Sequence, residues 1–313
     1  MDFVNKKGIV FTFIVVILLS IVIIIFLINV NNRFQTKIQT VNVKVETLNS
    51  FVKNLNSTYL PDALGASSNQ AIISLLDYES NNSYAPDSLD YLKQVISNGR
   101  YGGGIQESMF QGSLDYTLNN TLNEIRLLAE QQGATLEYTQ EDVDNAINSL
   151  TISHETPWTL KVSMNFKYRV SDIKNEVSWE INNANIYSTL NVENYRDPFY
   201  LIEPELGKFG VRIRKTPYGD FSDINDFNDH IKKVYFRANS NAPSFLVRLE
   251  GDFTPSSNGI ESILDPNYYS NPSGLSSLDY QYLNGVVGSC VFGMPSNFKL
   301  DTQHIDYYDR TEC

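Results

Sequence analysis

The 313-residue sequence has little of the residue types that most often carry catalysis or bind metals. It contains three histidines and two cysteines. There is no H-E-x-x-H and no C-x-x-C pattern, so neither common spacing of zinc ligands is present. The G-x-S-x-G turn of α/β-hydrolases is also absent. We therefore expect no metal, no cofactor and no enzymatic activity.

Basic residues are also scarce relative to acidic ones. The chain has 24 lysines and arginines against 36 acidic residues, a net charge of −12. An acidic surface argues against nucleic-acid binding and against a basic patch for a membrane surface. The 19 tyrosines and 17 phenylalanines indicate a folded domain rather than a disordered chain.

Polar residues are nearly missing from one stretch, Ile9 to Ile28, which has no charge and only Thr12 and Ser20 as interruptions. Twenty helical residues span about 30 Å, the thickness of a bilayer's hydrocarbon core. The run is too long for a secretory signal, and no cleavage site of that class follows it. The sequence thus predicts an uncleaved transmembrane helix over 9–30, bound to the lipid bilayer, after a short tail at 1–8.

Positive charges flank this helix on both sides and do not settle its orientation. Lys6 and Lys7 precede it, while Arg33, Lys37 and Lys44 follow it. An eight-residue tail with two lysines is hard to translocate. We therefore expect a single-pass protein with a cytoplasmic N-terminus and an extracytoplasmic main domain.

The helical pattern continues beyond the apolar run as a stalk over 31–60, which should break or kink at Leu60-Pro61. Apolar residues alternate at spacings of four and three, which is a heptad seam. This seam must bury against something. One candidate is the protein's own helices near Leu75 and Leu122, and the other is self-association through residues 34–59. The seam consists of Phe34, Ile38, Val41, Val45, Leu48, Val52, Leu55 and Tyr59.

After the stalk, helical spacing predicts a helical subdomain over 62–133. Strict alternation then predicts a strand at 158–170, and an antiparallel sheet-containing domain fills 145–313. The expected fold class is α+β. Its elements are helices over 62–78, 86–98, 114–128 and 220–234, a flexible glycine-rich loop over 98–104, and strands over 147–154, 158–170, 177–192 (with a bulge) and 209–214.

Lys7-Gly8-Ile9-Val10 resembles the cleavage motif of archaeal type IV prepilins, whose signal peptides are of class III. That resemblance implies cleavage after Gly8 and an apolar helix that remains as the core of a filament. Phe13 stands where many bacterial pilins have an acidic residue, which counts against a bacterial-type pilin.

Three later segments resemble recurrent segments of uncharacterised, membrane-anchored archaeal proteins, in order and in spacing. They are NYRDPFYLIEPE (194–205), NAPSFLVRLEG (241–251) and NGIESI (258–263). The resemblance implies an N-terminally anchored extracytoplasmic protein. It brings no established activity, so no functional residue is carried over.

Cys290 and Cys313 are close in sequence, and in an oxidising compartment we expect them to form a disulfide. The alternative is a thiol hydrolase, in which Cys290 is the nucleophile and His304 its base, oriented by Asp301 or Asp306. Against this, Asp301 is also a suitable N-cap for a short terminal helix.

Candidate N-glycosylation sites are Asn56, Asn81 and Asn119, although composition alone would give several such triplets. Arg248 is a candidate for a binding face or, alternatively, for pairing with a carboxylate inside the fold. We expect a non-enzymatic, membrane-anchored surface protein, in particular a pilin-like filament subunit. The alternative is an anchored ectodomain that binds a ligand or partner as a monomer.

Overall fold

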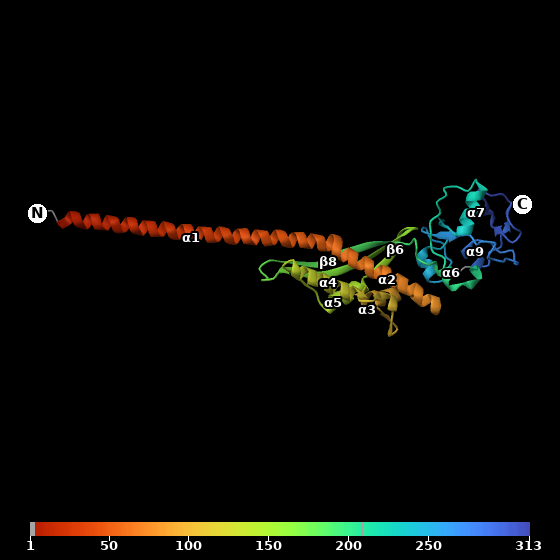
Figure 1. The fold of residues 1–313 in the computed structure, drawn as a ribbon, viewed down its shortest axis with the longest axis horizontal. Coiled ribbons are helices and arrows are strands. Elements are labelled where there is room, and N and C mark those ends of the chain that lie inside the picture. Colours follow the sequence, from red (N-terminus) through yellow and green to blue (C-terminus); the bar gives the residue numbers. More distant parts are fainter. Residues whose placement is uncertain (1–3, 208–209) are drawn as a thin grey trace.

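The computed structural model describes residues 4–207 and 210–313, with side chains from residue 18 onward except at 34, 36, 38 and 40. Its most prominent feature is helix α1 (Val4–Asn54), whose N-terminal half projects away from the rest of the chain (Figure 1). A π-helix, η1 (Leu55–Tyr59), joins it to α2 (Leu60–Asn81). The helix axis bends at this joint (Figure 1). Pro61 in the first turn of α2 lacks an amide donor, which accounts for the predicted kink.

The segment predicted to cross a membrane, 9–30, lies within α1. Within the part of the chain whose side chains are described, no helix is long and apolar enough to span a bilayer. Residues 9–17, and Gly8 with its candidate cleavage site, fall outside that part. From Leu18 to Ile28, ten of the large apolar side chains are each about half exposed or more.

The second half of the heptad seam packs within the chain. Leu48 and Leu55 are buried, and Val45 and Val52 are partly buried. Helix α1 contacts strand β7 (Thr159–Asp172), which was not among the two candidate partners, the helices near Leu75 and Leu122 or a second copy of the chain. The sheet supplies a wide flat apolar face, which suits the stripe of a straight helix. Phe34 and Ile38, at the other end of the seam, lie outside the side chains described.

The main sheet is antiparallel and is built around β7. Strand β8 (Ser178–Asn191) pairs along one edge of β7, while β5 (Ala134–Glu137) and β6 (Thr151–Thr156) pair with it at different levels. The register shift between Phe166 and Tyr168 places an extra residue in β8, which is the predicted bulge. The predicted strand at 147–154 begins only at Thr151.

Helices cover one face of this sheet and share its core. Alternate residues of β7, from Leu160 to Val170, are buried, and α2 packs on β8. Helix α4 (Leu118–Gln131) packs on β5 and α5 (Gln140–Asn148) on β7, while α3 (Ser88–Asn98) packs on the helices α2, α4 and α5. Helix α5 was not predicted. It starts at a capping box between Thr139 and Asp142, just before the predicted strand.

Two small hairpins lie between α3 and α4. The loop expected to be flexible at 98–104 contains β1 (Arg100–Tyr101) and β2 (Gly104–Ile105), joined through Gly102 and Gly103 at positive φ. The second hairpin pairs β3 (Phe110–Gln111) with β4 (Leu114–Asp115), after a 3₁₀ turn, η2 (Glu107–Met109). The helix predicted from residue 114 therefore starts later, at Leu118, where Thr117 is its N-cap.

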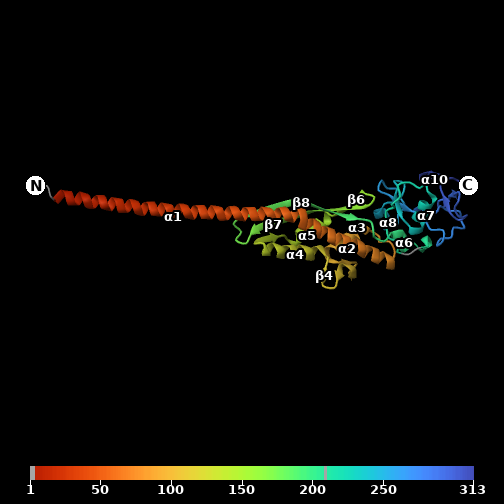
Figure 2. The same ribbon diagram turned by 45° about the horizontal axis from the view of Figure 1, so that its top comes forward.

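Residues 192–207 and 210–313 form the end of the molecule that is farthest from the start of α1 (Figure 2). The strand predicted at 209–214 is wrong over 210–214, where Arg212 makes only an isolated bridge to Arg196, and Phe209 lies outside the described residues. The predicted helix at 220–234 is present as α7 (Ile224–Lys233). The other elements are α6 (Pro198–Ile202), η3 (Pro204–Leu206), β9 (Phe236–Ala238), α8 (Phe245–Leu249), β10 (Ile260–Ser262), α9 (Asp279–Leu283), β11 (Ser289–Cys290), β12 (Lys299–Leu300) and α10 (Thr302–Tyr307).

Candidate functional site

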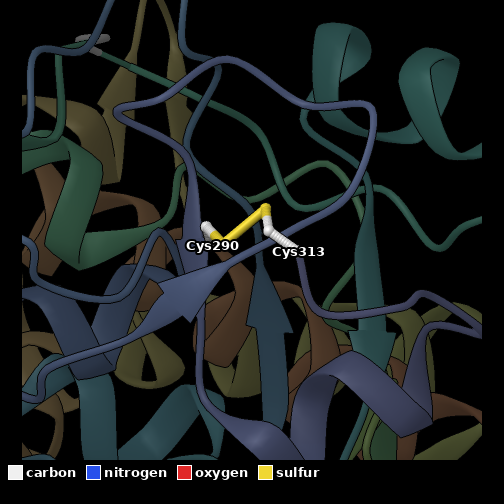
Figure 3. The surroundings of a disulfide bond; sticks show 2 residues. All are labelled: Cys290 and Cys313. Carbon is white, nitrogen blue, oxygen red and sulfur yellow. A yellow bond between two sulfur atoms is a disulfide. The ribbon is translucent and has the colours of Figure 1, made fainter.

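The predicted disulfide is confirmed. Cys290 in β11 is bonded to Cys313, with their Cα atoms 5.7 Å apart and a separation of 23 positions in sequence (Figure 3). Beside it, Phe292 donates its amide to the carbonyl of Thr311. The bond therefore holds the last residues of the chain against β11.

His304, the proposed base of a thiol hydrolase, lies in a different setting. Asp301 caps α10, as expected, and its carboxylate also contacts His304 Nδ1 at 2.6 Å. Nε2 lies 3.2 Å from Glu261 of β10. Burial lowers the pKa of His304, but the hydrogen bonds to these two carboxylates outweigh it and raise the pKa to about 9. The imidazole is thus a buried cation between two acids, and a sulfur held in a disulfide is no nucleophile.

Arg248 is fully buried, and it pairs with carboxylates inside the fold. Its guanidinium lies 3.0 Å from Asp197 and 2.9 Å from Asp279, both of which are also fully buried. It donates a further hydrogen bond to the carbonyl of Ile260. Phe199 lies against its face at 4.6 Å. These contacts join α6, α8, α9 and β10, so Arg248 holds the C-terminal part together rather than forming a binding surface.

The three candidate glycosylation sites differ in exposure. Asn56 is exposed in η1, and its side-chain oxygen accepts a hydrogen bond from Tyr168 at 2.7 Å. Asn81 is exposed at the end of α2, and Asn119 is half-buried in the first turn of α4. Their modification stays a prediction.

Sequence reasoning missed one candidate site, a groove at the end of the sheet where β7 turns into β8. It has a volume of about 500 Å³ and lies between α1 and the turn that joins β7 to β8. We call it the basic groove, after four of its lining residues: Arg33, Lys37, Lys44 and Lys174. The acidic composition predicts no such patch. The signal for the groove in the sequence was the spacing of Arg33, Lys37 and Lys44 along α1, four residues and then seven.

Lys44 anchors the groove to the sheet. Its ammonium lies 2.9 Å from Asp172 at the end of β7 and also pairs with Glu176 in the turn. Hydrogen bonds from Lys44 and from backbone amides lower the pKa of Asp172 to about 2. Arg33 and Lys37 are exposed, and no ion pair is found for either among the described residues.

A second groove, of about 510 Å³, lies where α2 meets the chain that follows β8. Tyr195 donates a hydrogen bond to Asn69 at 2.6 Å, and Arg196 pairs with Asp77 of α2. Its polar groups are thus largely engaged with one another. Among the described residues, no group of three or more histidine, cysteine or acidic side chains is placed to hold a metal ion.

Comparisons of this chain with known proteins identify no relative. No family model, no curated protein and no solved structure matches this chain.

Proposed function

We propose that this protein is a non-enzymatic, membrane-anchored surface protein with its main domain outside the cytoplasm. The proposal rests on the exposure of the apolar side chains of α1 from Leu18 to Ile28. Successive large apolar side chains there are exposed on all sides of a helix that projects from the domain. Such a surface needs an apolar environment, and the uncharged run from Ile9 is long enough to reach across a bilayer.

Within this role, a pilin-like filament subunit is the form that we favour. The Lys7-Gly8 motif before the apolar run supports it, as does the division of α1 into two halves. The second half packs on the sheet, so the domain is fixed to the helix, while the first half is left to associate with other copies. The alternative is a monomeric anchored ectodomain, which would use the same helix as a membrane anchor only.

Mass spectrometry of the protein from its native membrane separates the two forms. A filament subunit should begin at Ile9 after cleavage behind Gly8, and Gly8→Val should leave the full N-terminus in place. The variant Gly219→Val, at an exposed loop glycine, is a matched control that should still be processed. An unprocessed N-terminus in the wild-type protein would contradict the filament form and favour the monomeric ectodomain.

Protease added to intact cells tests the topology. It should digest residues beyond 60 and leave the anchor protected. Complete protection of the whole chain, in cells whose other surface proteins are digested, would place the domain inside and overturn the proposal.

A further inference from the structure

The basic groove stands out in a chain whose net charge is −12. Four cationic side chains line it, and the carboxylates within reach, Asp172 and Glu176, are both paired with Lys44. No ion pair is found for Arg33, Lys37 or Lys174 among the described residues, and the four cations against these two carboxylates leave the groove with a net positive charge. Like charges that converge in this way repel one another unless an anion lies between them.

The groove lies directly beyond the apolar part of α1. Arg33 and Lys37 follow Ile28 by five and nine residues, or about 8 and 14 Å along a helix. The polar headgroup layer of a bilayer begins where its hydrocarbon core ends. Long basic side chains extend toward this layer from positions just outside it. Asn29, which lines the same groove, marks its edge next to the apolar run.

The turn between β7 and β8 adds a second element to the groove. Lys174 lines the groove, and the neighbouring Ile173 is 71% exposed, among the highest values of any large apolar side chain described. The ion pairs of Lys44 hold the strand ends beside α1. A bilayer with anionic lipids is apolar inside and negatively charged at its surface. An exposed aliphatic side chain beside a lysine suits contact with such a surface.

We propose that the basic groove binds the phosphate headgroups of anionic lipids and seats the β7–β8 turn on the outer face of the membrane. This rests on the proposed membrane anchor. Each lysine or arginine near an anionic bilayer strengthens binding about fivefold, so the groove's excess of two cations over carboxylates favours one orientation of the domain. Binding would then fix the height of the domain above the membrane and its rotation about the axis of α1.

The test uses the full-length chain in nanodiscs of neutral phosphatidylcholine, with or without phosphatidylglycerol. Because both native cysteines form the disulfide, Ile173→Cys offers a single thiol for an apolar fluorophore. A constant fraction of lipid carries a nitroxide quencher on its headgroup. Quenching should be at least twofold stronger in the anionic nanodiscs, and it should weaken as sodium chloride rises from about 0.05 to about 0.5 M.

Charge reversal identifies the residues. Lys37→Glu combined with Lys174→Glu should remove the difference between the two nanodiscs. The matched control, Lys53→Glu with Lys167→Glu, makes the same change of charge on α1 and β7 but outside the groove, and should retain the difference. If both variants lose the difference in quenching equally, the overall charge of the chain causes it rather than these residues, and the assignment is overturned.

Two further results would also overturn the proposal. The first is equal quenching in neutral and anionic nanodiscs for the wild-type chain, a measurement that depends on no charge variant. The second is loss of quenching when phosphate replaces chloride at equal ionic strength, because the groove would then bind free phosphate. A chain that does not enter nanodiscs at all would instead refute the membrane anchor, so the two failures are distinguishable.

Discussion

The packing of the stalk on the sheet makes a prediction that separates folding from assembly. Leu48 of α1 is 2% exposed and Leu55 of η1 is fully buried, and both belong to the core that α1 shares with the sheet. Replacing a buried leucine by alanine removes three carbon atoms and leaves a cavity, which costs about 2–5 kcal/mol. We expect Leu48→Ala and Leu55→Ala each to lower the free energy of unfolding of the domain by about 3 kcal/mol. The expected fall in thermal midpoint is about 6–12 °C.

Thermal unfolding of the detergent-solubilised chain, followed by circular dichroism, measures this effect. Val43→Ala is the matched control, since Val43 is 62% exposed on the same helix and should change the midpoint little. Crosslinking on the same samples reports oligomers. If Leu48→Ala leaves the midpoint unchanged but abolishes crosslinked oligomers, this part of the seam is an interface between chains, and the packing argued above is refuted.

Three further perturbations act elsewhere in the fold. Cys290→Ser opens the loop that Cys313 closes and should cost about 3 kcal/mol in urea unfolding; two alkylatable thiols in the unreduced wild-type protein would contradict it. Arg248→Ala leaves two buried carboxylates without their cation and should cost about 3–5 kcal/mol, whereas the exposed Arg126→Ala should cost little, and equal effects would contradict the buried network. Burial raises the pKa of Glu79 to about 8, so stability should fall between pH 4.5 and 8, where the unfolded chain has lost a proton that the native state keeps. Glu79→Gln should remove this decline, and parallel pH profiles in urea unfolding would refute the assignment.

Local signals in the sequence determined several elements on their own. The alternation from Trp158 to Val170 predicted β7 within two residues, because the side chains of a strand alternate between two faces. The spacing of Ile224, Phe227 and Ile231 likewise predicted α7. Cys290 and Cys313 were the only two cysteines available, so their pairing followed from composition once an oxidising compartment was expected.

Other features depended on contacts between distant parts of the chain. The heptad seam was compatible with two partners, and only the position of β7, more than a hundred residues later, decided for its second half. Strand β5 has four residues and is held by pairing with β7, which no local pattern encodes. The strand expected at 209–214 also depended on a distant partner: residues 211–213 share three backbone hydrogen bonds with 194–197, and the pairing goes no further than the isolated bridge between Arg196 and Arg212.

The basic groove shows this division most clearly. Arg33 and Lys37 were visible in the sequence only as charges that left the membrane orientation open. The turn bearing Lys174 reaches them because Lys44 pairs with Asp172 across 128 residues. Sequence periodicity fixes which way a side chain faces on its own helix or strand. Tertiary packing decides which elements then meet, and here it brings cations that are far apart in the sequence together in one groove.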